Sequence, residues 1–429
     1  MIRIVRDSLR FAVAVFVCTA LASVAATAEV STAGQAAAPS VAQKALDSAR
    51  DLASLRWLRS ESSAQQEAAL RHIEQLGGQV EVEHDPRNMP FLVVTWVGGD
   101  EGMENLGSLA RLRWLDLSRA NVTDAGLEHI RDLKHLQVLK LQQTRVTDAG
   151  LANLSELEEL EGLALHDTKT SVIGLRHLQR LVNLKILNLS WTQTGDPGMA
   201  VVAGFPKLEE LYLFDGKVTD RGLAYLPKAR NLRALKLSYN DITNQGVAHL
   251  KSLTKLEALW LDFTRVDDAG LAYFRSMPNL HGLYLGDTQV TDAGLAKLTA
   301  VRGLEILDLS NLPITDEGLK NLEHCPALAM ISLEGTDVTS RGMASLARLA
   351  RVTQLNLAST AVDDEGLAAL ARLTHLTSIN LAQTRVTDAA LQAVESWPEL
   401  QEINLRGAKV SERALDALSA SRPKLKVVR

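Results

Sequence analysis

Val146-Thr147-Asp148-Ala149-Gly150-Leu151 is a stretch that recurs at one fixed interval along this 429-residue chain. The same six letters stand at 122–127 and 290–295, and close variants begin at Val218, Val266, Ile314 and Val386. A frame of apolar residues precedes the motif. The first residues of successive frames lie 24 residues apart without an insertion, at Leu112, Leu136, Leu160, Leu184, Leu208, Leu232, Leu256, Leu280, Leu304, Leu328, Val352, Leu376 and Leu400. The chain is therefore a repeat array, in which each unit takes the name of its first residue.

Each unit alternates apolar and other residues over its first six positions. Leu256, Leu259 and Leu261 are apolar, whereas Ala258 and Trp260 occupy positions 3 and 5 of that unit. Side chains of a strand alternate between its two faces, so positions 1, 4 and 6 are expected to point into a core. Thr-Asp before Ala-Gly-Leu is typical of a helix start, because a hydroxyl or a carboxylate there caps free N–H groups and the charge of Asp suits the helix dipole. Stacked units of this kind predict a concave parallel sheet with helices on the convex side.

Small polar residues recur at position 9, where the strand must bend, and we expect them to satisfy backbone groups of the loop. They are Thr144, Thr168, Thr192, Thr264, Thr288, Thr336, Thr360 and Thr384, with Asn240 once. The repeated glycines, such as Gly126, Gly150 and Gly222, indicate a close approach of neighbouring backbones. Residues 169–172 and 194–197 replace the usual motif, which predicts an irregular outer turn in those two units.

Leu-x-x-Leu-x-Leu followed by Val-Thr-Asp-Ala-Gly-Leu resembles the leucine-rich-repeat superfamily. The resemblance is closest to the 24-residue bacterial secreted type, which is related to the cysteine-containing and ribonuclease-inhibitor-like classes, and it covers residues 88–428. It implies an α/β solenoid shaped like a horseshoe, whose concave face and adjoining loops bind macromolecules, usually proteins. The resemblance implies no catalytic site, because the family has no common active site that could be assigned to residues of this chain. Many relatives have Asn or Cys at position 9, where this chain has Thr.

Residues 1–28 have the order of a secretory signal peptide. Arg3, Arg6 and Arg10 precede an apolar run over residues 11–24, and Ala-Thr-Ala at 26–28 provides a small-x-small cleavage site. The run is shorter than the ~20 residues that a spanning helix needs. We therefore expect a secreted or periplasmic protein with no stable membrane insertion after cleavage. Cys18 follows the bulky Val17, which disfavours a lipid-attachment site.

The rest of the chain divides into four parts. Residues 29–60 are expected to form a flexible tether and a loose helix. Residues 61–111 are expected to form an N-terminal cap and a degenerate first repeat, with a helix opened by Ser63-x-x-Gln66 and strands over 79–83 and 91–97. Thirteen repeats follow over 112–424, and residues 425–429 begin a C-terminal half-repeat.

The charge of the chain disfavours nucleic acid as a partner. Removing residues 1–28 leaves 43 Lys plus Arg against 50 Asp plus Glu, a net charge of −7. The sequence contains no basic stripe that would neutralise phosphates.

Nothing in the sequence has the pattern of a catalytic, cofactor or metal site. His129 and His177 are two units apart, a distance of about 10 Å at ~4.8 Å per strand, which is too far to share a metal. No nucleophile elbow, phosphate loop or metalloprotease motif is present. Cys325 occupies the slot that Leu133 and Leu157 hold in other units, which predicts a buried apolar filler. We expect a non-enzymatic protein.

Aromatic residues gather at outward positions in the middle of the array. Positions 3, 5, 7 and 8 of the five units from Leu184 to 303 hold seven of them: Trp191, Tyr212, Phe214, Tyr239, Trp260, Phe263 and Tyr284. The same positions of the other eight units hold only Trp114. Exposed Trp and Tyr in one patch are typical of binding hot spots. We expect these seven residues to form a partner-binding patch, with Lys236, Asp215, Asp262 and Asp287 as its polar surround.

Two functions remain open, together with the alternative that the aromatic residues have only a structural role. The first is an exported scaffold that binds a protein on its concave face, because a sheet several units wide suits a large partner. The second is a glycan or cell-wall binder that uses the same aromatics as stacking platforms beside carboxylates. The alternative to both is that some aromatics fold back to pad the sheet or pack between neighbouring loops.

Overall fold

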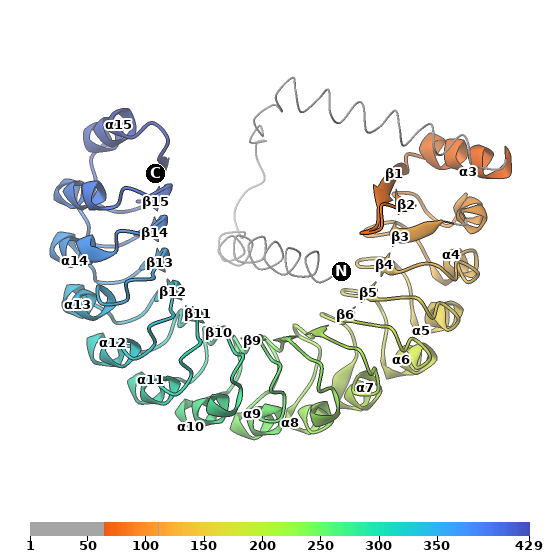
Figure 1. Cartoon of the computed structure of the whole chain (residues 1–429), viewed down its shortest axis with the longest axis horizontal. Coiled ribbons are helices and arrows are strands. Elements are labelled where there is room, and N and C mark those ends of the chain that lie inside the picture. Colours follow the sequence, from red (N-terminus) through yellow and green to blue (C-terminus); the bar gives the residue numbers. More distant parts are fainter. Residues whose placement is uncertain (1–63, 110) are drawn as a thin grey trace.

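A computed structural model describes residues 64–109 and 111–429. In this part of the chain, strands line the inner side of an open arc and helices lie along its outer side (Figure 1). The sheet has 16 strands in sequence order from β1 to β16. The predicted α/β solenoid with its concave sheet and convex helices is therefore confirmed. The predicted signal peptide and tether lie outside the described residues.

The strands recur every 24 residues from β4 onward. They are β1 (Gln79–His84), β2 (Pro90–Thr95), β3 (Leu112–Asp116), β4 (Val138–Lys140), β5 (Gly162–Ala164), β6 (Ile186–Asn188), β7 (Glu210–Tyr212), β8 (Ala234–Lys236), β9 (Ala258–Trp260), β10 (Gly282–Tyr284), β11 (Ile306–Asp308), β12 (Met330–Ser332), β13 (Gln354–Asn356), β14 (Ser378–Asn380), β15 (Glu402–Asn404) and β16 (Lys426–Val428). From β2 onward all pairs are parallel, and equivalent positions pair, as Leu211 does with Leu235. Equivalent side chains of neighbouring units are thereby aligned side by side.

Short helices form the outer side of the arc. The α-helices are α3 (Ala64–Gln75), α4 (Asp124–Glu128), α5 (Asp148–Leu151), α6 (Val172–Leu175), α7 (Gly195–Val202), α8 (Asp220–Leu223), α9 (Asn244–Leu250), α10 (Asp268–Leu271), α11 (Asp292–Leu298), α12 (Asp316–Leu322), α13 (Met343–Leu346), α14 (Asp364–Ala369) and α15 (Glu412–Ser421). The 3-10 turns are η1 (Met103–Ser108), η2 (Ala152–Leu154), η3 (Arg176–Leu178), η4 (Leu226–Lys228), η5 (Ala272–Ser276), η6 (Ser340–Gly342), η7 (Leu370–Arg372) and η8 (Asp388–Ser396). No helix among the described residues is both long and apolar enough to cross a membrane.

One hydrophobic core runs between the sheet and the helices. Positions 1, 4 and 6 of each unit are buried in it, as Leu256, Leu259 and Leu261 are. Cys325 is buried there in a leucine slot, as predicted, and burial raises the pKa of its thiol to about 11. Each buried leucine contributes about 2–5 kcal/mol against truncation to alanine, so the array is held together without a disulfide among the described residues.

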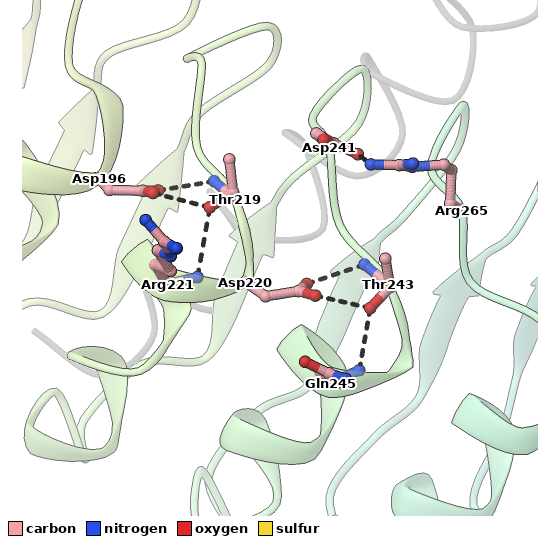
Figure 2. A network of polar contacts seen from close by, with 8 residues as sticks. All are labelled: Asp196, Thr219, Asp220, Arg221, Asp241, Thr243, Gln245 and Arg265. Atoms are coloured by element: carbon pink, nitrogen blue, oxygen red, sulfur yellow. Dashed lines mark hydrogen bonds and ion pairs between the residues drawn. The ribbon is translucent and has the colours of Figure 1, made fainter.

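A ladder of aspartates and threonines joins neighbouring units on the helical side (Figure 2). The carboxylate of Asp220 accepts hydrogen bonds from the backbone N of Thr243 at 2.8 Å and from its Oγ1 at 2.6 Å. The same hydroxyl accepts from the backbone N of Gln245 and so caps α9. The prediction was right for the threonine, which is the N-cap. The aspartate lies in the first turn of its own helix, where the dipole favours it, and its carboxylate binds the N-cap threonine of the next unit.

This ladder also explains the glycine of the motif. A Cβ atom added to Gly246 would lie 2.3 Å from Oδ1 of Asp220, in the preceding unit. Equivalent glycines, such as Gly150 and Gly318, meet the same obstacle. The expected close approach therefore involves a carboxylate, and glycine is required because the ladder fills the space of a side chain.

The two units without the motif behave differently. In the Leu160 unit Ser171 replaces the threonine, caps α6 and binds Asp148, so its outer turn is regular and the predicted irregularity is wrong there. In the Leu184 unit Thr194 is itself helical, has no side-chain capping bond and precedes Gly195 at φ 54°. That turn is irregular, as predicted, and the ladder is interrupted between Val172 and Thr194.

The segment before the first full repeat contains both predicted strands. Strands β1 and β2 pair in antiparallel register, and β2 continues into the parallel sheet through β3. Helix α3 buries Ala69 and Ile73. Its role as a cap for the solenoid stays a prediction.

Candidate functional site

The bend after each strand places residue 8 of every unit in one unusual conformation. The thirteen residues at this position all have positive φ, between 48° and 73°: Arg119, Gln143, Asp167, Trp191, Asp215, Tyr239, Phe263, Asp287, Asn311, Gly335, Ser359, Gln383 and Gly407. The bend is fixed between units, since the backbone N of Trp191 donates to the carbonyl of Phe214 at 2.8 Å. Left-handed φ suits Gly, Asn and Asp and costs other residues roughly 1–2 kcal/mol.

Position 9 completes the bend. The hydroxyl of Thr264 donates to the carbonyl of Leu261 at 2.6 Å, and most position-9 threonines make the same bond. Asn240 instead donates to three carbonyls, including that of Leu213 in the preceding unit. These bonds confirm that the residues at position 9 satisfy the loop backbone.

Four predicted aromatic residues form one continuous row along this bend, which we call the aromatic row: Trp191, Phe214, Tyr239 and Phe263. Ring centroids are 4.7 Å apart for Trp191 and Phe214 and 4.7 Å for Phe214 and Tyr239. Tyr239 and Phe263 stack at 4.1 Å with 24° between their planes. His166 lies at the Trp191 end, 6.2 Å away, and burial lowers its pKa.

The aromatic row stays accessible to solvent. Trp191, Tyr239 and Phe263 are 51%, 45% and 42% exposed, and Phe214 is half-buried among them. Three residues with large rings thus combine an unfavourable backbone conformation with high exposure.

The other three predicted aromatics project from position 5 of the strands and pack more deeply. Trp260 stacks on Tyr284 with centroids 4.9 Å apart and planes within 10°, and Tyr284 is only 8% exposed. The hydroxyl of Tyr212 donates to Oε2 of Glu210 at 2.7 Å. The structure therefore divides the seven residues between the accessible row and an inner group that packs on the sheet. Trp114 lies apart from both in β3, near Lys140.

Acidic residues lie among these rings. Burial raises the pKa of Asp262 to about 6, and Ser238 donates to its Oδ2 at 2.9 Å. Burial also raises the pKa of Asp308, at position 5 two units further along. Asp215 pairs with Lys217 at 2.6 Å, and Asp287 accepts from Asn311 at 2.9 Å. Three of these four carboxylates were predicted from the sequence as part of the patch, and Asp308 was not.

Lys236 is the basic residue of the site. Its Nζ lies 5.4 Å from the centroid of the Phe214 ring, and burial lowers its pKa. Glu210, beside Tyr212, has a pKa that burial raises. Glu210 stands in the same unit as Tyr212, and Asp308 stands one unit beyond Asp287. Both occupy outward positions and were missed, because the aromatic residues alone defined the predicted patch.

The described residues offer no metal centre and no enclosed hollow at the rings. No group of three or more His, Cys, Asp or Glu in this part of the chain is arranged to hold a metal ion. Two shallow hollows lie elsewhere, one beside Arg302 and His324 and one beside Gln65 and His72. The accessible surface at the site is therefore a ridge of rings, which suits contact with a large molecule.

Comparisons with known proteins agree with this architecture. A family profile described as a leucine-rich repeat region matches residues 104–295, and a second leucine-rich-repeat profile matches residues 352–371. A crystal structure of an internalin from Listeria monocytogenes is 23% identical, covers 70% of this chain and 82% of its own, and superposes with a TM-score of 0.55. A leucine-rich-repeat protein of Leptospira interrogans is 18% identical, covers 76% and 80%, and gives a TM-score of 0.52.

No curated protein sequence matches this chain significantly. The assignment to the 24-residue bacterial secreted type stays a prediction. The repeat motif, the sheet of parallel strands and the two family profiles nevertheless agree. The chain belongs to the leucine-rich-repeat superfamily.

Proposed function

We propose that this protein is an exported, non-enzymatic scaffold that binds a protein partner, and that the aromatic row is the centre of its binding surface. The observation that carries the proposal is the conformation of Trp191, Tyr239 and Phe263, which place large exposed rings at positive φ. Six of the other ten units hold Asp, Asn or Gly at this position, which adopt positive φ at lower steric cost, and the remaining four hold Arg119, Gln143, Ser359 and Gln383. Strained residues that persist on a surface support a functional role.

Ring stacking offsets this cost least at Trp191, at one end of the row. A stacked aromatic pair contributes about 0.5–1.5 kcal/mol beyond the burial of its area. Trp191 has one ring of the row beside it, Phe214, and leaves half of its surface in water. Trp and Tyr are enriched at the centres of protein interfaces, where a partner covers such surface.

Packing of the rings favours a protein partner over a glycan. A sugar stacks on an open ring face, whereas Tyr239 and Phe263 turn faces toward each other at 4.1 Å. Trp260 and Tyr284 are likewise parallel at 4.9 Å. One face of each of these rings is therefore covered by its neighbour, and a continuous row of partly exposed rings suits apolar side chains of a polypeptide. A glycan or cell-wall ligand is the second candidate, supported by the carboxylates beside the rings.

Export is part of the proposal because residues 1–28 have the order of a signal peptide. The neighbouring internalin and the Leptospira protein support the fold alone. Intact-mass analysis of material from the culture medium or periplasm tests this point, with removal of 28 residues as the expected result. Full-length protein recovered from the cytoplasm would contradict it.

The binding proposal is tested with a triple variant, Trp191→Ala, Tyr239→Ala and Phe263→Ala. The purified protein and the variant are used to capture partners from the native envelope fraction, and quantitative mass spectrometry compares the two captures. Trp114→Ala is the matched control, since Trp114 is an exposed ring outside the site. We expect a protein that the wild type and the control retain and the triple variant loses.

The same three proteins applied to a glycan array separate the two candidates. Binding of a defined glycan that the triple variant loses, without a protein that depends on the row, would support the second candidate. Equal capture by wild type and triple variant would place the binding surface elsewhere.

A further inference from the structure

Carboxylates are interleaved with the aromatic row along the same bend. Position 8 reads Asp167, Trp191, Asp215, Tyr239, Phe263 and Asp287 in six successive units. An aspartate therefore lies beyond each end of the row, and a third lies within it. Because equivalent positions of neighbouring units are aligned at roughly 4.8 Å per strand, these carboxylates face the same side as the rings.

Two further carboxylates lie on the sheet beside the row. Asp262 stands at position 7, next to Phe263 in the chain, and Asp308 stands at position 5 of a strand two units further along. Both are partly buried, and burial raises the pKa of each. Ser238 donates a hydrogen bond to Asp262, Ser310 donates one to Asp308, and the charge of Lys236 also favours the ionised form of Asp262. A desolvated carboxylate is costly unless a cation compensates it.

Cations of the protein balance only part of this charge. Positions 3, 5, 7 and 8 of the seven units from Leu160 to 327 hold six acidic residues and one basic residue, Lys236. Two other cations of these units are engaged in ion pairs: Lys217 pairs with Asp215, and Arg233 pairs with Glu257 at 2.6 Å. The site therefore combines rings with an excess of negative charge.

We propose that the partner presents a basic polypeptide segment, rich in Arg or Lys and carrying apolar side chains between them, along the aromatic row. This inference rests on the proposed function and adds the chemistry of the partner. Apolar side chains of the segment contact the ring edges, and its cations reach Asp262, Asp287 and Asp308. Guanidinium groups suit this surface, because they bind carboxylates in two-point geometry and also pack on aromatic rings.

Selection from a displayed library of random 12-residue peptides tests the inference. Peptides are enriched on the wild-type protein and then measured one by one against two variants. One is the ring variant (Trp191→Ala, Tyr239→Ala, Phe263→Ala), and the other is the acid variant (Asp262→Asn, Asp308→Asn). The pair Asp132→Asn and Asp337→Asn removes two exposed carboxylates elsewhere and is the matched control.

We expect enriched peptides with a net positive charge that bind the ring variant and the acid variant each at least about tenfold more weakly than the control. Their affinity should also fall at least severalfold between 50 and 300 mM NaCl, because salt screens such contacts. Neutral or acidic peptides that need the rings and ignore the acid variant would overturn the inference while leaving the proposed function in place. Enrichment that is equal on wild type and ring variant would overturn both.

A second copy of this chain is the other occupant to exclude. Sedimentation equilibrium of the wild type and the ring variant is measured over the same concentration range. A monomer in both cases agrees with a separate basic partner. Dimerisation that the ring variant abolishes would place a second copy on the row and overturn the inference.

Discussion

Tyr239 and Phe263 stack with their ring centroids 4.1 Å apart, although 24 residues separate them in the chain. Both have positive φ, 61° and 54°, and both leave more than two fifths of their surface exposed. Their contact exists because the 24-residue register aligns position 8 of neighbouring units. The repeat thus builds a continuous surface from residues that are distant in sequence.

Replacing Trp191 by asparagine separates binding from stability. Asparagine tolerates the left-handed conformation that Trp191 adopts at φ 53°, and the lost ring is half exposed. We expect the free energy of unfolding to change by less than about 1 kcal/mol, while partner binding weakens by about 2 kcal/mol or more. Urea unfolding and titration calorimetry measure the two quantities. A loss of stability above about 2 kcal/mol would show that Trp191 pads the structure.

The ladder between units predicts unequal effects for two neighbouring aspartates (Figure 2). Asp220→Ala removes two charge-assisted bonds and leaves the backbone N of Thr243 without its acceptor, so we expect a loss of about 1–3 kcal/mol in urea unfolding. Asp241→Ala breaks only an exposed ion pair with Arg265 and should cost less than about 1 kcal/mol. Equal losses in the two variants would contradict a structural role for the ladder.

Gly246→Ala tests why the motif contains glycine. An alanine in a helix is ordinarily more stable than a glycine by up to about 1 kcal/mol. Here the added Cβ would meet Asp220 at 2.3 Å and Ile242 at 3.0 Å, so we expect a destabilised protein.

The effects of Gly246→Ala and Asp220→Ala on the free energy of unfolding should be coupled, because the carboxylate of Asp220 is the group that the added Cβ atom meets. In an Asp220→Ala background the cost of Gly246→Ala should fall by at least about 1 kcal/mol, which a double-mutant cycle measures. Gly366→Ala is a comparison, since its Cβ would meet Ser340 rather than an aspartate. Additive effects of Asp220→Ala and Gly246→Ala would rule out this explanation.

The fold was predictable because the repeat leaves few choices. Leucines at positions 1, 4 and 6 fix the strand and its inner face, and a constant spacing without insertions fixes the register of every later strand. The partner of Asp220 was not predictable, because within one unit the free N–H groups of its own helix are equally good hydrogen-bond donors to its carboxylate. Only the stacking of units brings Thr243 to the carboxylate.

The site was predictable only in part. Alternation identified the outward positions, and counting aromatics there found Trp191, Phe214, Tyr239 and Phe263. Alternation does not distinguish position 5, on the sheet, from position 8, on the bend. For this reason the sequence left open which aromatics pad the sheet, and Tyr284 is one that does. The signal for the bend was present in Gly335 and Gly407, since glycine favours positive φ at that position.

The stability of the site should depend on pH through Asp262. Its folded-state pKa is raised to about 6 by burial, above the value of about 3.9 for an unfolded chain. Between about pH 4 and pH 6 the folded protein therefore holds a proton that the unfolded chain has released. This contribution to stability is complete below about pH 4 and is lost as the pH rises through 6, which leaves an unfavourable carboxylate at neutral pH.

Asp262→Asn removes that carboxylate and keeps its shape. At pH 7.5 we expect the variant to be more stable than the wild type by about 1–3 kcal/mol, whereas at pH 4 the two should be alike. Urea midpoints measured from pH 4 to pH 8 give the comparison, and Asp337→Asn controls for the loss of one exposed charge. A basic segment bound at the site should reverse the order at neutral pH, because its cation stabilises the wild-type carboxylate and not the amide. If the two proteins differ equally at both pH values, Asp262 is not desolvated and cannot supply the charge that the proposed partner requires.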